Sequence, residues 1–194
     1  MRKMALVLGS AIALAACSSS AAPDPVMSPA VDLSNPLFAP GYMAMAASGD
    51  LFEIQSSQLA LQASANPGVR GFANMLIADH TRMTQQMMAA AQSAGLAPPP
   101  PALLPHHQAM LDQLRAAGSG PAFDAAFQQV QIAAHQEALQ LHQNYAAGGD
   151  VPALRAVASQ AVPAITMHLQ HAQSLQVMAP MPAPQATPSP GERG

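Results

Sequence analysis

The side chains with the most chemistry to offer are one acid and three histidines that fall inside predicted helices: Glu53, His80, His135 and His168. Only 9% of the 194 residues are Asp, Glu, Lys or Arg, so an ionisable residue on the apolar side of a helix stands out. Imidazole nitrogens suit zinc, copper and nickel. We therefore predict a single Zn, Cu or Ni ion held by these four residues. Asp79 either supports a histidine from outside or replaces His80 as a ligand, depending on how the helix is turned.

A second interpretation of the same residues needs no metal. Buried polar groups in proteins are almost always hydrogen-bonded, and a buried Glu–His network can fix the register of a helical bundle without binding anything. The two interpretations differ in one geometric requirement. A metal site needs the four side chains to converge on one point.

Counting from the first predicted turn brings two of the candidates together. Glu53 lies 13 residues before Asn66, and His80 lies 14 residues after it. Residues equally far from the turn of an antiparallel helical hairpin lie at similar heights, because each residue rises about 1.5 Å. Glu53 and His80 are therefore predicted to face each other.

Counting from the second turn gives a poorer match. His135 lies 14 residues before Gly149, whereas His168 lies 19 residues after it. This offset of five residues places His168 about 7 Å out of the layer. Pro163 lies inside the same predicted helix, and we expect it to kink or split that helix, which would change the height of His168.

The elements that must position these residues are helices. Ala, Leu, Met and Gln are good helix formers, and only 4% of the residues are aromatic. Apolar residues recur every three or four positions along four long segments and one short one, as in amphipathic helices. The sequence predicts an all-α four-helix bundle, with a short extra helix in the link between the second and third long helices. The helices are expected at about residues 42–64, 67–94, 106–117, 121–147 and 151–176.

Proline-rich stretches mark the ends of the predicted bundle. Five prolines lie between residues 23 and 40, and five more between residues 180 and 190. Such segments favour extended chain over helix. We expect a Pro/Ala/Ser-rich tether over residues 17–40, the bundle over 41–178 and a disordered tail over 179–194.

The first residues are typical of an export signal. Arg2 and Lys3 precede an apolar run over residues 4–13 that is too short to span a bilayer as a helix. The following Leu-Ala-Ala-Cys run, ending at Cys17, resembles the lipobox of bacterial lipoproteins. That resemblance implies a signal peptide over residues 1–16, an acylated Cys17, and a membrane anchor that holds the protein at the outer membrane, facing the periplasm. The net charge of −3 and the lack of any other basic cluster exclude nucleic acid as an expected partner.

Several short motifs, taken in order, resemble the bacterial exported family called domain of unknown function 4142. The resemblance covers about residues 38–176 and implies a ferritin-like four-helix fold without an established reaction. The motifs are Phe52-Glu53, Ala78-Asp79-His80, Phe123-Asp124, Ala134-His135-Gln136, Val162-Pro163 and His168-Leu169.

The sequence departs from the di-iron pattern of ferritin-like proteins, in which two helices each carry Glu-x-x-His. Ile77 stands three residues before His80, and Ile165 stands three residues before His168. A di-iron centre is therefore the weaker match, because too few carboxylates are present. The sequence also contains no phosphate-binding loop, nucleophile elbow or His-Glu-x-x-His motif. We expect a metal-binding or stress-related envelope protein, more in keeping with a binding protein than an enzyme. The alternative is a structural or interaction module without a metal.

Overall fold

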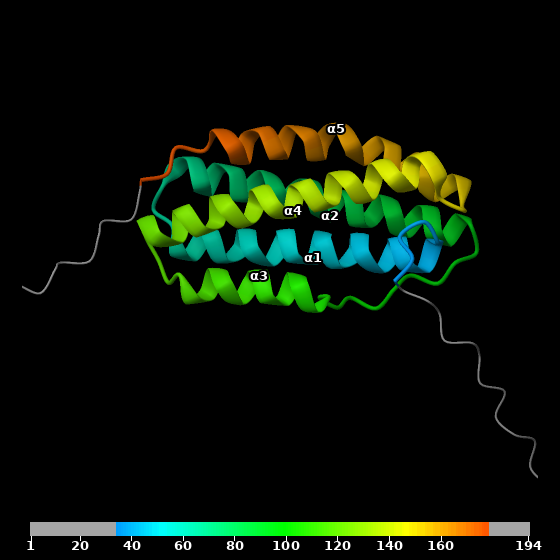
Figure 1. Ribbon diagram of the computed structural model, residues 1–194, viewed down its shortest axis with the longest axis horizontal. Coiled ribbons are helices and arrows are strands. Elements are labelled where there is room, and N and C mark those ends of the chain that lie inside the picture. Colours follow the sequence, from blue (N-terminus) through cyan, green and yellow to red (C-terminus); the bar gives the residue numbers. More distant parts are fainter. Residues whose placement is uncertain (1–33, 179–194) are drawn as a thin grey trace, which may run out of the picture. The chain divides into compact units, whose positions relative to one another are not determined.

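The computed structural model describes residues 34–178, which contain five helices and no strand. The predicted signal peptide over residues 1–16, Cys17, most of the predicted tether and the predicted tail over residues 179–194 lie outside this range. The helices are α1 (Ala39–Ala63), α2 (Pro67–Ser93), α3 (Pro105–Ala116), α4 (Pro121–Gly148) and α5 (Pro152–Ser174) (Figure 1).

Proline opens each helix of the described region at its first or second position. The missing N–H of proline costs nothing there, because the first backbone donors of a helix have no partner within it. At α2 the Asn66 side chain also accepts from the amides of Gly68 at 2.8 Å and Val69 at 3.4 Å. These start signals are local, which is why every predicted helix boundary lies within three residues of the observed one.

The four long helices form a bundle of two antiparallel hairpins, α1–α2 and α4–α5, which pack through α1 against α4 and α2 against α5. The link between the hairpins returns along the bundle, so that α4 begins beside the end of α1. There the Gly120 amide donates to the Ala63 carbonyl at 2.9 Å. Gly120 adopts φ +71°, a conformation that favours glycine. Helix α3 lies outside the four, against α1 and α4 (Figure 1). The predicted all-α bundle with an extra helix in the link is confirmed.

Helix α5 runs without interruption through Pro163. Of the two predicted effects of this proline, a kink or a split, the split is wrong. Proline removes one backbone hydrogen bond, but Ala161 and Ile165, two positions before and after it, are buried in the bundle. Their packing holds the helix together across the missing bond.

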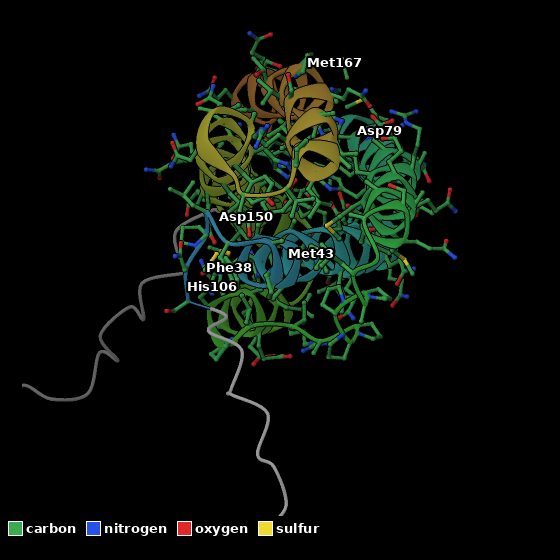
Figure 2. The ribbon with its side chains drawn as sticks, turned by 90° about the vertical axis from the view of Figure 1, so that its right-hand side faces the viewer. Phe38, Met43, Asp79, His106, Asp150 and Met167 are labelled. Atoms are coloured by element: carbon green, nitrogen blue, oxygen red, sulfur yellow. The ribbon has the colours of Figure 1, made fainter. Side chains whose placement is uncertain are left out.

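The core divides into two apolar ends and a polar middle, and side chains fill the space between the helices (Figure 2). The end near the α1–α2 turn is built on four buried phenylalanines, Phe52, Phe72, Phe123 and Phe127. The opposite end contains Tyr42 and Tyr145, whose rings stack 3.8 Å apart. Between the two ends lies a layer of buried acids and histidines. Among residues 34–178, no helix is both long and apolar enough to cross a bilayer.

Candidate metal centre

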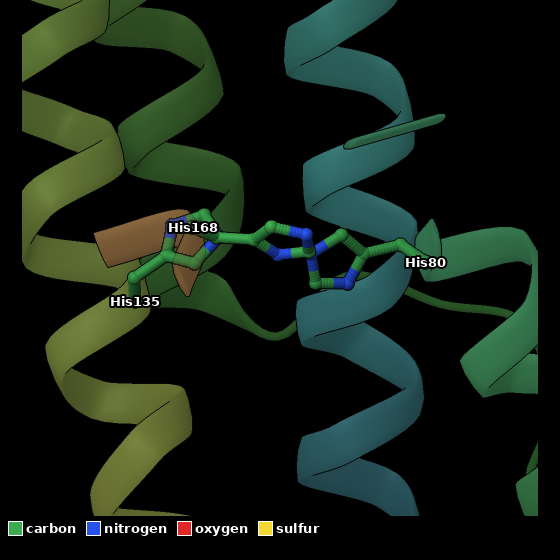
Figure 3. Close-up of side chains that lie close together, drawn as sticks. All are labelled: His80, His135 and His168. Carbon is green, nitrogen blue, oxygen red and sulfur yellow. The ribbon is translucent and has the colours of Figure 1, made fainter. Parts of the chain in front are cut away.

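Three histidines from three helices meet in the middle of the bundle (Figure 3). They are His80 on α2, His135 on α4 and His168 on α5, and all three are buried. Their ring centroids are 5.4 to 5.7 Å apart, nearly an equilateral triangle. Each ring offers one nitrogen to a group in which all three ligand atoms lie within 4.8 Å of one another. The structure therefore brings together the three histidines that the sequence singled out.

Each imidazole is held through one nitrogen by a neighbouring acceptor. His80 Nδ1 lies 2.8 Å from Asp50 Oδ1, His135 Nδ1 lies 2.8 Å from the Gln131 carbonyl, and His168 Nε2 lies 2.8 Å from Asp79 Oδ2. A backbone carbonyl only accepts, so the proton of neutral His135 sits on Nδ1. Carboxylates fix the other two rings in the same way.

The second nitrogen of each ring is left without a hydrogen-bond partner. His80 Nε2, His135 Nε2 and His168 Nδ1 are buried and have no hydrogen-bond partner. A buried polar atom without a partner costs about 1–3 kcal/mol. Histidines that bind metals almost always donate the other ring N–H to a carboxylate or a backbone carbonyl, and all three rings have that arrangement here.

Glu53 lies at the edge of the histidine triangle. Its Oε1 is 3.6 Å from His135 Nδ1, and its Oε2 is buried without a partner. The sequence predicted that Glu53 faces His80. The two do line the same small cavity, but His80 Nδ1–H donates its hydrogen bond to Asp50, about one turn earlier on α1.

Of its two predicted roles, Asp79 takes that of supporting a histidine from outside the group of ligands. One carboxylate oxygen contacts His168, and the other accepts from Arg82 at 2.7 Å. Asp79 thus orients His168 from α2. Because α2 also carries His80, this one helix fixes the positions of two of the three rings.

His168 lies in the layer from which simple counting excluded it. The α4–α5 turn is centred nearer Asp150 than Gly149, since α4 ends at Gly148 and α5 begins at Pro152. Side chains also lean toward the N-terminus of their own helix. In an antiparallel pair this carries His168 toward the turn and His135 away from it. Both effects reduce the predicted offset between His168 and His135.

Burial and neighbouring charges set the protonation of the layer. Burial, together with the charge on His80, lowers the pKa of His135 to about 3. Burial also lowers the pKa of His168, against the opposing effect of Asp79. Burial alone would lower the pKa of His80 as well, but its hydrogen bond to Asp50 and the nearby acids raise it overall. His135 and His168 are therefore neutral at pH 7, the form in which imidazole binds metals.

Burial also changes the acidity of Glu53. Burial raises its pKa to about 7, partly offset by the charge of His80. A carboxylate with this pKa is protonated in part of the molecules at neutral pH. Binding of a cation nearby would ionise it fully and release its proton.

The donor set fits one transition-metal ion better than a cluster of two. Three imidazole nitrogens and one nearby carboxylate match the preferences of zinc, copper and nickel. A carboxylate-bridged di-iron pair needs more oxygen ligands than these residues supply. Zn, Cu and Ni remain the candidate ions. Of the predicted ligands, His80, His135 and His168 bring their ligand atoms together, whereas Glu53 and Asp79 are not part of that group.

Two residues that position the site were not anticipated from the sequence. Asp50 binds His80 and also accepts from the Thr84 hydroxyl at 2.8 Å. The Gln131 carbonyl orients His135. Asp50 precedes Glu53 by three residues and so shares its helix face, a signal that the sequence does contain. The role of the Gln131 carbonyl leaves no such signal, because every residue has one.

Comparisons with known proteins agree with this fold. Two solved structures of CopM, in a Cu(II)-bound and an Ag-bound form, superimpose with TM-scores of 0.59 and 0.58. Each is 20% identical to this chain and covers 70% of it and 93% of its own length. No curated protein matches. The model of the family described as "Domain of unknown function (DUF4142)" matches residues 24–175. The chain therefore belongs to the DUF4142 family.

Proposed function

We propose that this protein binds one transition-metal ion in the middle of its bundle, through His80, His135 and His168, with Glu53 as the nearby carboxylate. Two observations carry the proposal together: each of the three rings keeps one buried nitrogen without a partner, and each offers a ligand atom that lies within 4.8 Å of those of the other two. A network that only fixed the register of the helices would pair these nitrogens with one another or with Glu53.

Copper is the first ion to test. The CopM structures of similar fold contain Cu(II) and Ag, and an imidazole-rich site suits Cu(II). The role we propose is binding or buffering of the ion rather than catalysis.

The proposed location is the cell envelope. In our proposal, acylation of Cys17 anchors the protein to the outer membrane, and the bundle faces the periplasm. A Cys17→Ser variant would then incorporate no labelled fatty acid in growing cells. Continued labelling of that variant would contradict the anchor.

The metal proposal is tested by the metal content of the purified protein. Elemental analysis after exposure to Cu(II), Zn(II) or Ni(II) and removal of loosely bound ions with a weak chelator is expected to show retained metal. His135→Gln and His168→Gln should each lose one equivalent. The matched control is His142→Gln, a buried histidine of α4 that binds Tyr42 at 3.1 Å. Folded variants with unchanged metal content would favour the purely structural network.

A further inference from the structure

A second group of ligating side chains lies outside the bundle core, where α3 packs against α4. His106 and His107 on α3 and Glu137 on α4 each place one ligand atom within 4.8 Å of the others. His106 Nε2 lies 2.8 Å and His107 Nε2 lies 3.9 Å from the same Glu137 oxygen. Two imidazoles and one carboxylate are a common donor set for copper and zinc.

This group combines one buried and fixed ring, that of His107, with two accessible side chains, those of His106 and Glu137. His107 is buried, its ring stacks on Phe52, and its Nδ1 lies 2.7 Å from the Ser48 hydroxyl. The Ser48 oxygen already accepts from the Leu104 amide at 2.7 Å, and its second lone pair can accept from Nδ1–H. That arrangement leaves His107 Nε2 for a ligand. The side chains of His106 and Glu137 are 43% and 44% exposed, so an ion reaches them directly from solvent.

A small cavity connects this group with the core centre. His107 and Glu137 line it together with Glu53 and His80, and its volume is about 20 Å³. That volume is close to the minimum needed for one water molecule, so the cavity has room for a single small ion. Because Glu137 is exposed and Glu53 is buried, the cavity leads from the surface toward the layer of core histidines.

The surface group is separate from the outer partners of the core centre. In the view along the bundle, His106 and Asp79 lie on opposite sides of the helices (Figure 2). Substitutions at His106 and Glu137 therefore leave Asp79 and the hydrogen bond that holds His168 unchanged.

We propose that His106, His107 and Glu137 form a second metal site, which takes an ion such as Cu(II) from solution and passes it through the cavity to the core centre. Binding of an ion at the surface group does not depend on the proposed core centre. Only the transfer step rests on the proposed function of the core.

The surface site is tested in a protein whose core centre is disabled. Cu(II) is titrated into the His135→Gln/His168→Gln double variant and followed by calorimetry and electron paramagnetic resonance. One ion per chain is expected to bind, and adding Glu137→Gln or His106→Ala should weaken its binding at least tenfold. Asp112→Asn is the matched control, because it removes another exposed carboxylate, on α3. No binding to the double variant, or equal binding after Glu137→Gln, would overturn the surface site.

The unmodified core provides a second readout if the double variant does not fold. His106→Ala in the otherwise wild-type chain should reduce the bound Cu(II) from two ions to one. An unchanged number of ions would overturn the surface site. Loss of an ion in His168→Gln alone reports on the core, so failure of the core proposal and failure of the surface site give different results.

Transfer is tested by the rate at which the core fills. Glu137→Gln should slow the appearance of the core Cu(II) signal about tenfold and leave its final intensity unchanged. Gly49→Leu narrows the same route from α1, and binding at the surface group is measured in parallel because the added side chain contacts His107. Gly49 lines the cavity, and a Cβ placed on it would lie 3.7 Å from the His107 ring. Filling of the core at the wild-type rate in both variants would overturn transfer through this cavity.

Discussion

The apolar end of the bundle near the α1–α2 turn and the polar layer in its middle differ in how completely their groups are satisfied. At the apolar end, Phe127 contacts Phe72 edge-to-face and stacks on Phe123, and burial itself stabilises these rings. In the middle layer, His80, His135 and His168 each keep one buried nitrogen without a partner.

This difference distinguishes residues that stabilise the fold from residues that serve a function. An apolar side chain at these middle positions would stabilise the bundle more than an unpaired imidazole does. Positions at which a sequence departs from what its fold favours are often functional sites. The middle layer is therefore where a ligand is expected, and the phenylalanine end is the scaffold that positions it.

The largest expected effect comes from breaking the scaffold. Phe127→Ala should lower the free energy of unfolding by about 3–5 kcal/mol, because it leaves a cavity among buried rings. Chemical denaturation measures this loss. The core should still bind one metal ion per folded chain, since Phe127 supplies no donor. Loss of the ion from a variant that remains folded would show that the two regions are not separable.

A smaller effect, on metal affinity, is expected from a substitution at Asp79, which lies between the buried layer and the solvent. Asp79→Asn keeps the shape of the side chain and removes the charge that holds His168 Nε2. Outer partners of this kind change metal affinity about 10–100-fold, and competition with a chelator of known affinity measures the change. Arg82→Ala is the control, because an exposed ion pair with Asp79 contributes at most about 1 kcal/mol. Equal effects of the two variants would contradict the role given to Asp79.

The smallest effect is a difference in acid sensitivity. Burial lowers the pKa of His142 to about 4, with the charge of His80 adding to it and that of Asp50 opposing it. The unfolded chain therefore binds a proton below about pH 6.5 that the folded chain does not bind until about pH 4, and stability falls as the pH drops through this window.

His142→Gln removes this contribution and keeps a polar partner for Tyr42. Between pH 7 and pH 5 the metal-free variant should lose about 1–2 kcal/mol less unfolding free energy than the wild type. Denaturation curves at the two pH values provide the test. Parallel losses in both proteins would mean that His142 is not held neutral by the fold.

The helices could be predicted closely because their signals are local. Asn66 followed by Pro67 marks the start of α2 in the sequence, and the structure shows the Asn66 cap in place. The continuity of α5 could not be predicted from Pro163. It depends on burial of the neighbouring residues, which is a property of the assembled bundle.

The site was predictable in its members but not in its contacts. Three mid-helix histidines could be identified as candidate ligands because ionisable residues are scarce in this chain, and in the structure their ligand atoms lie close together. Counting residues gives heights along a helix, but it gives neither the lean of a side chain nor its rotation about the axis. That is why His168 was placed too far away, and why Asp50 rather than Glu53 proved to be the hydrogen-bond partner of His80.

The most direct test of the central claim is anomalous diffraction at the copper edge from crystals grown with one equivalent of Cu(II). We predict an anomalous peak between His80 Nε2, His135 Nε2 and His168 Nδ1, the three buried nitrogens without partners. Density without anomalous signal between these nitrogens, in crystals that contain copper elsewhere, would contradict a metal centre in the core.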